Sequence, residues 1–375
     1  MNNVIIVRYG ELFLKSEPVL KKFEKTLIEN IKIGLKKEKI KFKILRKRGR
    51  IFVETSQIKR SSSVLKRIFG VVSFSPCFNI KSSEIKKIQI FVKKNYKKWI
   101  GKNQKFAVRA KRVGRHSYTS QKLAKLIGDV VDRKVDLSNP DVEIFIEVRD
   151  NDSYIYTKVI KGPGGMPLGT SGKVVCLVSG GIDSAVASWL MMKRGCTIIP
   201  LFASKSKSRK VFLDVIKELK KWHLGKNMRI FIFDQRKNLD KFNKKAYRYT
   251  CILCKRMMYK VANGLAKKMN AKAIVTGESL AQVASQTLDN LMVLDQASEL
   301  PIFRPLIGLD KTESIDIAKR IGTYEKSIED KKICWAVPKK PKTKAKLEEV
   351  LKIEDELKIE KIMKESFKTL REVSV

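Results

Sequence analysis

The stretch Val174–Ala187 reads VVCLVSGGIDSAVA. Its apolar beginning predicts a buried strand of a parallel sheet. Ser179, Gly180 and Gly181 follow, and a helix is expected to begin near Ser184. Glycines let backbone N–H groups approach an anion closely, and the N-terminus of a helix adds the positive end of its dipole. Because the two serines add hydroxyl donors, the stretch predicts a phosphate-binding loop.

The pattern of this loop separates it from the two commonest nucleotide-binding loops. It lacks both G-x-x-x-x-G-K-[ST] and G-x-G-x-x-G. The motif SGG-x-DS instead resembles the PP-loop of ATP pyrophosphatases, which cleave ATP to AMP and pyrophosphate. That resemblance implies a loop that holds the leaving pyrophosphate, with Asp183 holding Mg²⁺ or orienting the loop. An ordinary strand–turn–helix is the alternative.

Strands and helices alternate on the C-terminal side of the loop. We expect further strands at residues 197–202, 228–233 and 273–276, and helices at 184–194, 209–222, 251–269 and from Leu280 onward. This alternation implies an α/β fold with a parallel sheet and helices on both faces. After Thr343 the chain is rich in Lys and Glu, and we expect helices there without a further domain.

The N-terminal half predicts two smaller α+β units. The first has strands at 4–8 and 50–54 and a helix at 18–32. The second has helices at 85–99 and 120–131, the latter capped by Thr119 or Ser120, and strands at 105–110, 142–148 and 154–160. The Gly- and Pro-rich KGPGGMPLGTSGK follows and predicts a linker. The expected domains are therefore residues 1–55, 56–161 and 173–375, with a linker at 162–172.

Charge and cysteine content limit the possible functions. The 375 residues include 81 Lys and Arg against 38 Asp and Glu, a net charge of +43. A lysine-rich genomic composition accounts for part of this excess, and a polyanionic partner such as RNA explains the rest. Six cysteines are too few for a disulfide scaffold. No apolar run approaches the about 18 residues of a membrane span. We therefore expect a cytoplasmic protein with reduced thiols and no membrane partner.

Several motifs resemble the tRNA 4-thiouridine synthetases, or tRNA sulfurtransferases, over nearly the whole chain. They include YGELFLKS, GRHSYTS, GPGGMPLGTSGKV, CILCKRMMYKVANGLA, VTGESLAQVASQTLDNL and RPLIGLDKTESIDIAKRIGTYEKSI. The resemblance implies a ferredoxin-like domain, a THUMP domain that helps to grip the acceptor end of tRNA, and a PP-loop domain. It also implies formation of 4-thiouridine at position 8 of tRNA. The C-x-x-C motif makes the chain similar to archaeal members, and we expect no rhodanese domain.

The resemblance also implies the residues of an ATP site. Leu177 and Val178 would offer backbone to ATP, and Phe202 would flank adenine or simply pack in the core. Lys255 and Lys311 would contact phosphates. The remaining candidates are Gly277, for its close backbone approach, and Gln286, expected on the helix after the fourth strand. In the second unit a basic set is expected to contact RNA phosphates: Lys105, Arg109, Lys111, Arg112, Arg115, His116 and Tyr118.

Cys251 and Cys254 form the C-x-x-C pair, and Cys334 lies far from them in the sequence. Four interpretations remain open. The cysteines are buried core residues, or a redox pair with Cys334 as a persulfide carrier, or zinc ligands, or ligands of a [4Fe–4S] cluster. A closed zinc site requires a fourth ligand, and no histidine stands near in the sequence. A cluster held by three thiolates leaves one iron open for a sulfide, and the archaeal-type resemblance favours it.

The hypothesis from the sequence is an ATP-dependent tRNA sulfurtransferase that uses Mg²⁺. The uridine C4 oxygen attacks the α-phosphorus of ATP, pyrophosphate leaves, and sulfur then displaces AMP, with Asp183 and Cys334 as catalytic residues. Sulfide or a cysteine desulfurase would supply the sulfur, and relatives are often homodimers. The alternatives are an AMP-forming ligase acting on another substrate and a non-catalytic tRNA-binding protein. An RNA methyltransferase is disfavoured, because Asn139-Pro140-Asp141 does not match its N-P-P-[YF] motif.

Overall fold

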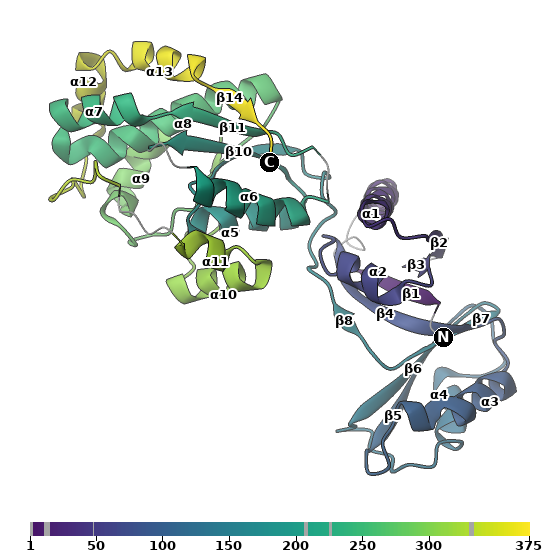
Figure 1. Ribbon diagram of the computed structural model, residues 1–375. Helices are drawn as coiled ribbons and strands as arrows, with labels where there is room; N and C mark the ends of the chain where they lie inside the picture. The colour runs from purple at the N-terminus through teal and green to yellow at the C-terminus, as the bar shows by residue number, and fades with distance from the viewer. Residues whose placement is uncertain (1–2, 11–15, 48, 206–208, 225–226, 330–333) are drawn as a thin grey trace. The chain divides into compact units, whose positions relative to one another are not determined.

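A computed structural model describes residues 3–10, 16–47, 49–205, 209–224, 227–329 and 334–375 (Figure 1). Residues 11–15 of the motif YGELFLKS lie outside this range, and so do residues 330–333 directly before Cys334. The chain divides into two compact units, Met1–Gly165 and Met166–Val375, and each is described by itself. The expected boundary between residues 55 and 56, like the expected linker at 162–172, stays a prediction.

The first unit is built on one sheet with the order β2-β3-β1-β4-β7-β6-β5, and β8 also pairs with β4. Neighbouring strands are antiparallel, except for the parallel pair β5–β6. The strands are β1 (Val4–Tyr9), β2 (Lys43–Lys47), β3 (Arg50–Glu54), β4 (Val71–Ile80), β5 (Phe106–Val113), β6 (Val142–Arg149), β7 (Asp152–Tyr156) and β8 (Ile160–Lys161). Since β4 pairs with both β1 and β7, one hydrogen-bonded sheet runs through both N-terminal segments.

Four α-helices cover this sheet: α1 (Glu17–Lys37), α2 (Ile58–Leu65), α3 (Ile85–Asn95) and α4 (Ser120–Gly128). The apolar stripe of α1 buries Leu27, Ile31 and Leu35 completely. Helix α4 begins as expected, because the side chain of Thr119 accepts a hydrogen bond from the backbone N–H of Lys122. It ends at Gly128, three residues earlier than its apolar pattern predicts.

The second unit contains a six-stranded sheet with the order β13-β12-β9-β10-β11-β14. Its strands are β9 (Lys173–Leu177), β10 (Thr197–Ser204), β11 (Ile230–Asp234), β12 (Ile274–Val275), β13 (Ile302–Phe303) and β14 (Arg371–Val373). All pairs are parallel except β11–β14. The predicted parallel sheet is confirmed. The antiparallel edge strand β14 was not expected from the Lys- and Glu-rich C-terminus.

Helices cover both faces of this sheet (Figure 1). On one side α5 (Ile182–Lys193), α6 (Lys210–Trp222), α10 (Lys311–Ile321) and α11 (Tyr324–Ile328) pack together. On the other, α8 (Thr250–Met269) contacts α7 (Arg236–Lys245), α9 (Leu288–Asp295) and α13 (Ile359–Lys368), and α12 (Leu347–Glu356) contacts α13. No helix in the described ranges is long and apolar enough to cross a membrane.

One helix start in this unit agrees with the expectation and another is wrong. The helix after β9 begins at Ile182, two residues before Ser184, which lies in its first turn. The helix expected from Leu280 begins only at Leu288, because Ala281 has a φ of +60° that interrupts a right-handed helix. Gln286 therefore lies in a short 3₁₀ turn, Ala284–Gln286, and not on the following helix.

Candidate active site

A cavity of about 240 Å³ opens at the carboxyl ends of β9, β10 and β12. This is the edge at which ligands bind in open parallel α/β sheets. Most of the expected ATP residues line it: Leu177, Val178, Ser179, Gly181, Asp183, Ser184, Phe202, Lys255, Gly277 and Gln286. Seven further residues complete the lining: Leu201, Ala203, Lys205, Met258, Tyr259, Thr276 and Glu278. The tertiary structure therefore gathers residues from positions 177 to 286 around one space.

The loop between β9 and α5 is held in shape by its own serines. Ser184 Oγ donates to the Gly181 carbonyl at 3.0 Å and accepts from the Ser179 N–H at 3.2 Å. The Gly181 N–H in turn donates to Ser179 Oγ at 3.3 Å. Gly180 has a φ of +89°, and a Cβ there would lie 3.1 Å from the Phe212 nitrogen. This position therefore requires glycine, both for its left-handed backbone and for the close approach of α6.

Gly277, directly after β12, touches the same loop from the other side. A Cβ on Gly277 would lie 2.6 Å from the carbonyl carbon of Asp183 and 2.6 Å from the Ser184 nitrogen. No side chain fits into this gap. The close backbone approach expected at Gly277 is therefore made to the phosphate-binding loop of the chain itself.

Lys311, at the start of α10, reaches the loop from a distant part of the chain. Its ammonium donates to both carboxylate oxygens of Asp183 at 2.8 Å. The side chain of Asp183 is 26% exposed and that of Lys311 is 44% exposed, so solvent and ligands can reach the pair. A cation is thereby placed beside the loop, where the phosphates of a bound nucleotide would lie.

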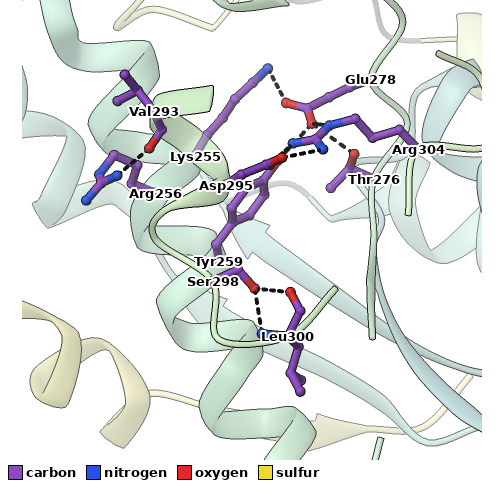
Figure 2. A network of polar contacts seen from close by, with 10 residues as sticks. All are labelled: Lys255, Arg256, Tyr259, Thr276, Glu278, Val293, Asp295, Ser298, Leu300 and Arg304. Carbon is purple, nitrogen blue, oxygen red and sulfur yellow. Dashed lines mark hydrogen bonds and ion pairs between the residues drawn. The ribbon is translucent and has the colours of Figure 1, made fainter. Parts of the chain in front are cut away.

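A buried carboxylate that the sequence analysis missed lies in the lining of the same cavity, at the centre of a polar network (Figure 2). Glu278 is 5% exposed, and its Oε1 accepts from Lys255 Nζ at 2.8 Å. Its Oε2 accepts from the Tyr259 hydroxyl at 2.7 Å, from Thr276 Oγ1 at 3.0 Å and from Arg304 Nε at 2.9 Å. The signal available in the sequence was its position directly after Gly277 in VTGES.

The charges around Glu278 determine its ionisation. Burial by itself would raise the pKa of Glu278, but the nearby Lys255 and Arg304 and the hydrogen bonds to its carboxylate lower the pKa to about 2. Burial and the Glu278 charge raise the pKa of Tyr259, which therefore stays a hydrogen-bond donor. Asp295 accepts two hydrogen bonds from Arg304 and fixes it from the far side. The network positions Lys255 at the cavity with its charge balanced.

The aromatic ring of Phe202 on β10 lines the cavity, and it packs on the buried Phe212 of α6. The rings of Phe202 and Phe212 stack with their centroids 4.5 Å apart and an interplanar angle of 9°. Across the cavity, Gln286 is 8% exposed, and its Oε1 has no hydrogen-bond partner among the described residues. An apolar slab and a free acceptor suit a flat base with an exocyclic amine, such as adenine.

The three cysteines lie beside the cavity. Cys254 is buried, Cys251 and Cys334 are partly exposed, and Cys334 packs against the same apolar core as Cys254. The Cys254 sulfur raises the pKa of Lys205 in spite of its burial, and Cys334 and Cys251 act in the same direction. Since Lys205 lines the cavity, the thiols and the phosphate-binding loop adjoin the same space.

The fit of these thiols to a metal cluster is mixed. Three cysteines with a neighbouring cation have the donor chemistry that an iron–sulfur cluster requires. Buried Gln235 donates to Cys254 Sγ at 3.6 Å, as residues around metal-bound sulfur commonly do. However, nowhere in the described ranges do three His, Cys, Asp or Glu side chains come together closely enough to hold a metal ion.

The basic residues expected to bind RNA lie on and after β5 in the first unit. Two of the charges are partly neutralised: Lys105 pairs with Asp136 at 3.1 Å and Arg109 with Glu143 at 2.7 Å. His116 Nε2 lies 2.9 Å from the Asp150 carbonyl oxygen.

The rest of this basic set differs in exposure. The Tyr118 hydroxyl donates to the Ser83 carbonyl, so this ring is also engaged within the unit. Lys111 and Arg115 are exposed, and Arg112 is partly exposed. These three are therefore the better candidates for contacts with RNA.

Comparison with known proteins identifies the family. Residues 169–359 match the family described as thiamine biosynthesis protein (ThiI). A relative from Saccharolobus islandicus, named "Probable tRNA sulfurtransferase", is 43% identical over 371 residues, which cover 97% of this chain and 98% of the relative. The chain belongs to the ThiI family of tRNA sulfurtransferases. Residues 4–75 match the ThiI ferredoxin-like domain and residues 82–158 the THUMP domain.

Other members of the ThiI family agree with this assignment. A "Probable tRNA sulfurtransferase" from Methanosarcina mazei is 41% identical and covers 98% of this chain and 95% of its own length. A crystal structure of a 4-thiouridine synthetase–RNA complex with bound ATP superimposes with a TM-score of 0.88 at 31% identity, covering all of both chains. The predicted order of ferredoxin-like, THUMP and PP-loop domains is confirmed.

Proposed function

We propose that this chain is an ATP-dependent tRNA sulfurtransferase that converts a uridine of tRNA, at position 8, into 4-thiouridine. One observation carries the proposal: the cavity lined by the phosphate-binding loop is also lined by Ala203 and Tyr259, which pack in the same core as Cys254 and Cys334. Nucleotide activation and sulfur delivery can therefore take place on one bound base. The related crystal structure with RNA and ATP supports the same substrates.

In the first step the C4 carbonyl oxygen of uridine attacks the α-phosphorus of ATP. A new P–O bond forms, the bond between the α-phosphorus and the bridging oxygen breaks, and pyrophosphate leaves. Backbone N–H groups at Gly180 and Gly181, with Lys311 and Lys255, would stabilise the charge on the departing phosphates. Asp183 is the residue that would hold Mg²⁺, in exchange for or beside its present partner Lys311.

In the second step a sulfur nucleophile attacks C4. The C–S bond forms, the C4–O bond breaks, AMP leaves, and the resulting thiocarbonyl gives up any proton carried by the sulfur. Adenylation makes this possible because AMP is a far better leaving group than oxide. Lys205 would keep a sulfur anion next to the activated base. We propose sulfide or a cysteine desulfurase as the source of the sulfur. We also propose Cys334 as the cysteine that lies nearest to C4 of the uridine when the sulfur is transferred.

We propose Cys251, Cys254 and Cys334 as the residues that would hold a [4Fe–4S] cluster. When bound, such a cluster has one iron without a protein ligand, which can bind a sulfide. Persulfide chemistry on Cys334 remains the competing proposal, because it needs no metal.

The first experiment follows the nucleotide products. Purified protein, tRNA, ATP and sulfide should yield AMP, pyrophosphate and 4-thiouridine, with pyrophosphate release stimulated by tRNA and not by amino acids. ADP as the product would overturn the proposal. Stimulation by amino acids without thiolation would favour a ligase, and tRNA binding without AMP formation would favour a non-catalytic RNA-binding protein.

The second experiment tests the cluster. Anaerobically purified wild type should contain iron and sulfide and absorb visible light, and Cys251→Ala should lose both. A colourless, iron-free wild type that still thiolates tRNA would remove the cluster proposal. A persulfide on Cys334 would be favoured only if thiolation then required a cysteine desulfurase, which supplies sulfur already at the persulfide level, and did not proceed with sulfide alone. Gel filtration with light scattering, with and without tRNA, tests the further proposal that the enzyme acts as a homodimer.

A further inference from the structure

A second cavity of about 470 Å³ opens in the same unit, at the carboxyl ends of β10 and β11 beside the edge strand β14. Its polar lining consists of Ser204, Arg209, Asp234, Arg236, Thr369 and Arg371. None of these residues belongs to the ATP site described above. Three guanidinium groups around one cavity are unusual, because like charges repel unless an anion lies between them.

The charges of this cavity do not cancel. Asp234 is fully engaged by Arg236, whose Nε and Nη2 lie 3.0 and 2.6 Å from its two oxygens. The hydrogen bonds from Arg236 lower the pKa of Asp234, so the pair stays ionised and neutral overall. Arg209 and Arg371 also line the cavity, and neither forms an ion pair with a residue in the described ranges.

Arg209 has a buried donor that points to an anionic ligand. Its Nε is buried and has no hydrogen-bond partner among the described residues. Leaving a buried donor unpaired is destabilising, and more so when the group is charged. An anion in the cavity would accept this hydrogen bond and offset the charge. A guanidinium offers two parallel donors, which match two oxygens of a phosphate.

The second cavity lies next to the ATP cavity at the carboxyl end of β10. Ala203 and Lys205 line the ATP cavity, while Ser204 between them lines the second cavity. The two cavities therefore meet at the carboxyl end of β10. Because both cavities open at the carboxyl end of β10, an RNA that places a base against the α-phosphate can lay its backbone along this edge of the sheet. Its next phosphates then come within reach of the second cavity.

We propose that this second cavity binds a backbone phosphate of the substrate RNA, next to the nucleotide that is thiolated, through Arg209 and Arg371. The inference rests on the proposed function. The contact is independent of sequence and sets the position of the RNA strand relative to ATP. Thr369 lines the same cavity and has a hydroxyl that can serve the same phosphate.

The test uses Arg209→Ala and Arg371→Ala in the full-length chain. Each should raise the KM for tRNA about tenfold or more, the loss expected for one charge-assisted hydrogen bond. The KM for ATP should not change. Each variant should also reduce the slope of log K against log salt for tRNA binding by about one. Arg→Lys at either position should recover part of the affinity, because the charge is kept.

Arg229→Ala is the matched control. Arg229 lies just before β11 and forms an exposed bidentate pair with Glu372 on β14, at 2.8 and 2.6 Å. The substitution removes the same type of side chain from the amino end of β11, outside the lining of the cavity, and should leave the KM for tRNA and the salt slope unchanged. An equal effect of all three Ala variants would overturn the proposal by indicating a general loss of positive charge.

Inorganic phosphate separates a site for RNA from a site for a free anion. It should compete with tRNA in wild type, with weaker competition in Arg209→Ala. If both variants keep the wild-type KM for tRNA, the proposal is wrong. The proposal is also wrong if the two variants lose only the competition by inorganic phosphate, because the cavity is then a site for a free anion and not for RNA. The thiolation assay on wild type distinguishes failure of this proposal from failure of the proposed function. A wild type that does not thiolate tRNA contradicts the proposed function and does not by itself contradict the phosphate contact in the second cavity.

Discussion

The ammonium of Lys311 lies 2.8 Å from each carboxylate oxygen of Asp183, although 128 positions separate the two residues. Asp183 belongs to the phosphate-binding loop and Lys311 to the first turn of α10. The pair keeps a cation at the mouth of the loop before nucleotide binds. It also gives Lys311 a definite position, which a solvated lysine would lack.

Lys311→Ala should lower kcat for pyrophosphate release by about 10²- to 10³-fold, as expected when one preorganised donor to a developing charge is lost. Binding of tRNA should stay near the wild-type value, because the substitution is confined to the ATP site. Single-turnover assays with labelled ATP measure the first effect. Lys319→Ala, on the same helix and packed over Tyr324, is the control and should keep wild-type turnover.

Glu278→Gln should destabilise the fold by about 3–5 kcal/mol, because Lys255 and Arg304 would keep buried charges without their partner. Urea unfolding measures this loss. The matched control is Glu360→Gln, which breaks a Glu–Lys pair of the same length, 2.8 Å, whose carboxylate is 64% exposed. A surface pair of this kind contributes about 0–1 kcal/mol. Equal losses in the two variants would contradict the role given to Glu278.

The contribution of Glu278 should also depend on pH. Its pKa is lowered from 4.5 to about 2 in the folded protein, so the folded state favours the ionised carboxylate. The resulting stabilisation, about 3 kcal/mol, is complete above about pH 4.5 and disappears as pH falls toward 2. The difference in unfolding free energy between wild type and Glu278→Gln should therefore shrink between pH 6 and pH 3. A constant difference would mean that Glu278 is not the group that titrates.

Gly277→Ala should disturb ATP binding more than folding. The new methyl group would lie 2.6 Å from backbone atoms of Asp183 and Ser184, so the phosphate-binding loop has to move. A displacement of this size is expected to lower kcat/KM for ATP on the order of 10²-fold. Gly308→Ala serves as the control, because a Cβ there meets nothing within 4 Å. Isothermal titration with ATP distinguishes the two variants.

The cysteines should differ in reactivity in metal-free protein. Cys77 and Cys176 are completely buried. Burial raises the pKa of Cys176 to about 12 and also raises the pKa of Cys77. Both should resist iodoacetamide at pH 8, whereas the partly exposed Cys251 and Cys334 should react. Peptide mass spectrometry measures the order, and early labelling of Cys77 or Cys176 in folded protein would contradict the burial.

Most of the second unit could be predicted from its sequence because its signals are local. A continuous apolar strand, the glycine pair and the helix that follows indicate the phosphate-binding loop without any knowledge of the rest of the chain. Boundaries failed where backbone conformation overrode the apolar pattern. Ala281, with its positive φ, delayed a helix by eight residues, from the expected Leu280 to Leu288. The edge strand β14 was missed because its three residues have too little pattern to be recognised.

The sequence by itself determined the family, the order of the domains and the chemical types available at the site, because glycine loops, capping residues and apolar periodicity act over a few neighbouring residues. Only the tertiary structure decided which charges meet. The order of strands in the sheet brings Lys311 to Asp183, Arg304 to Glu278 and the three cysteines to Lys205. Electrostatic interactions depend on distance in space and on burial, and neither can be inferred from separation along the chain.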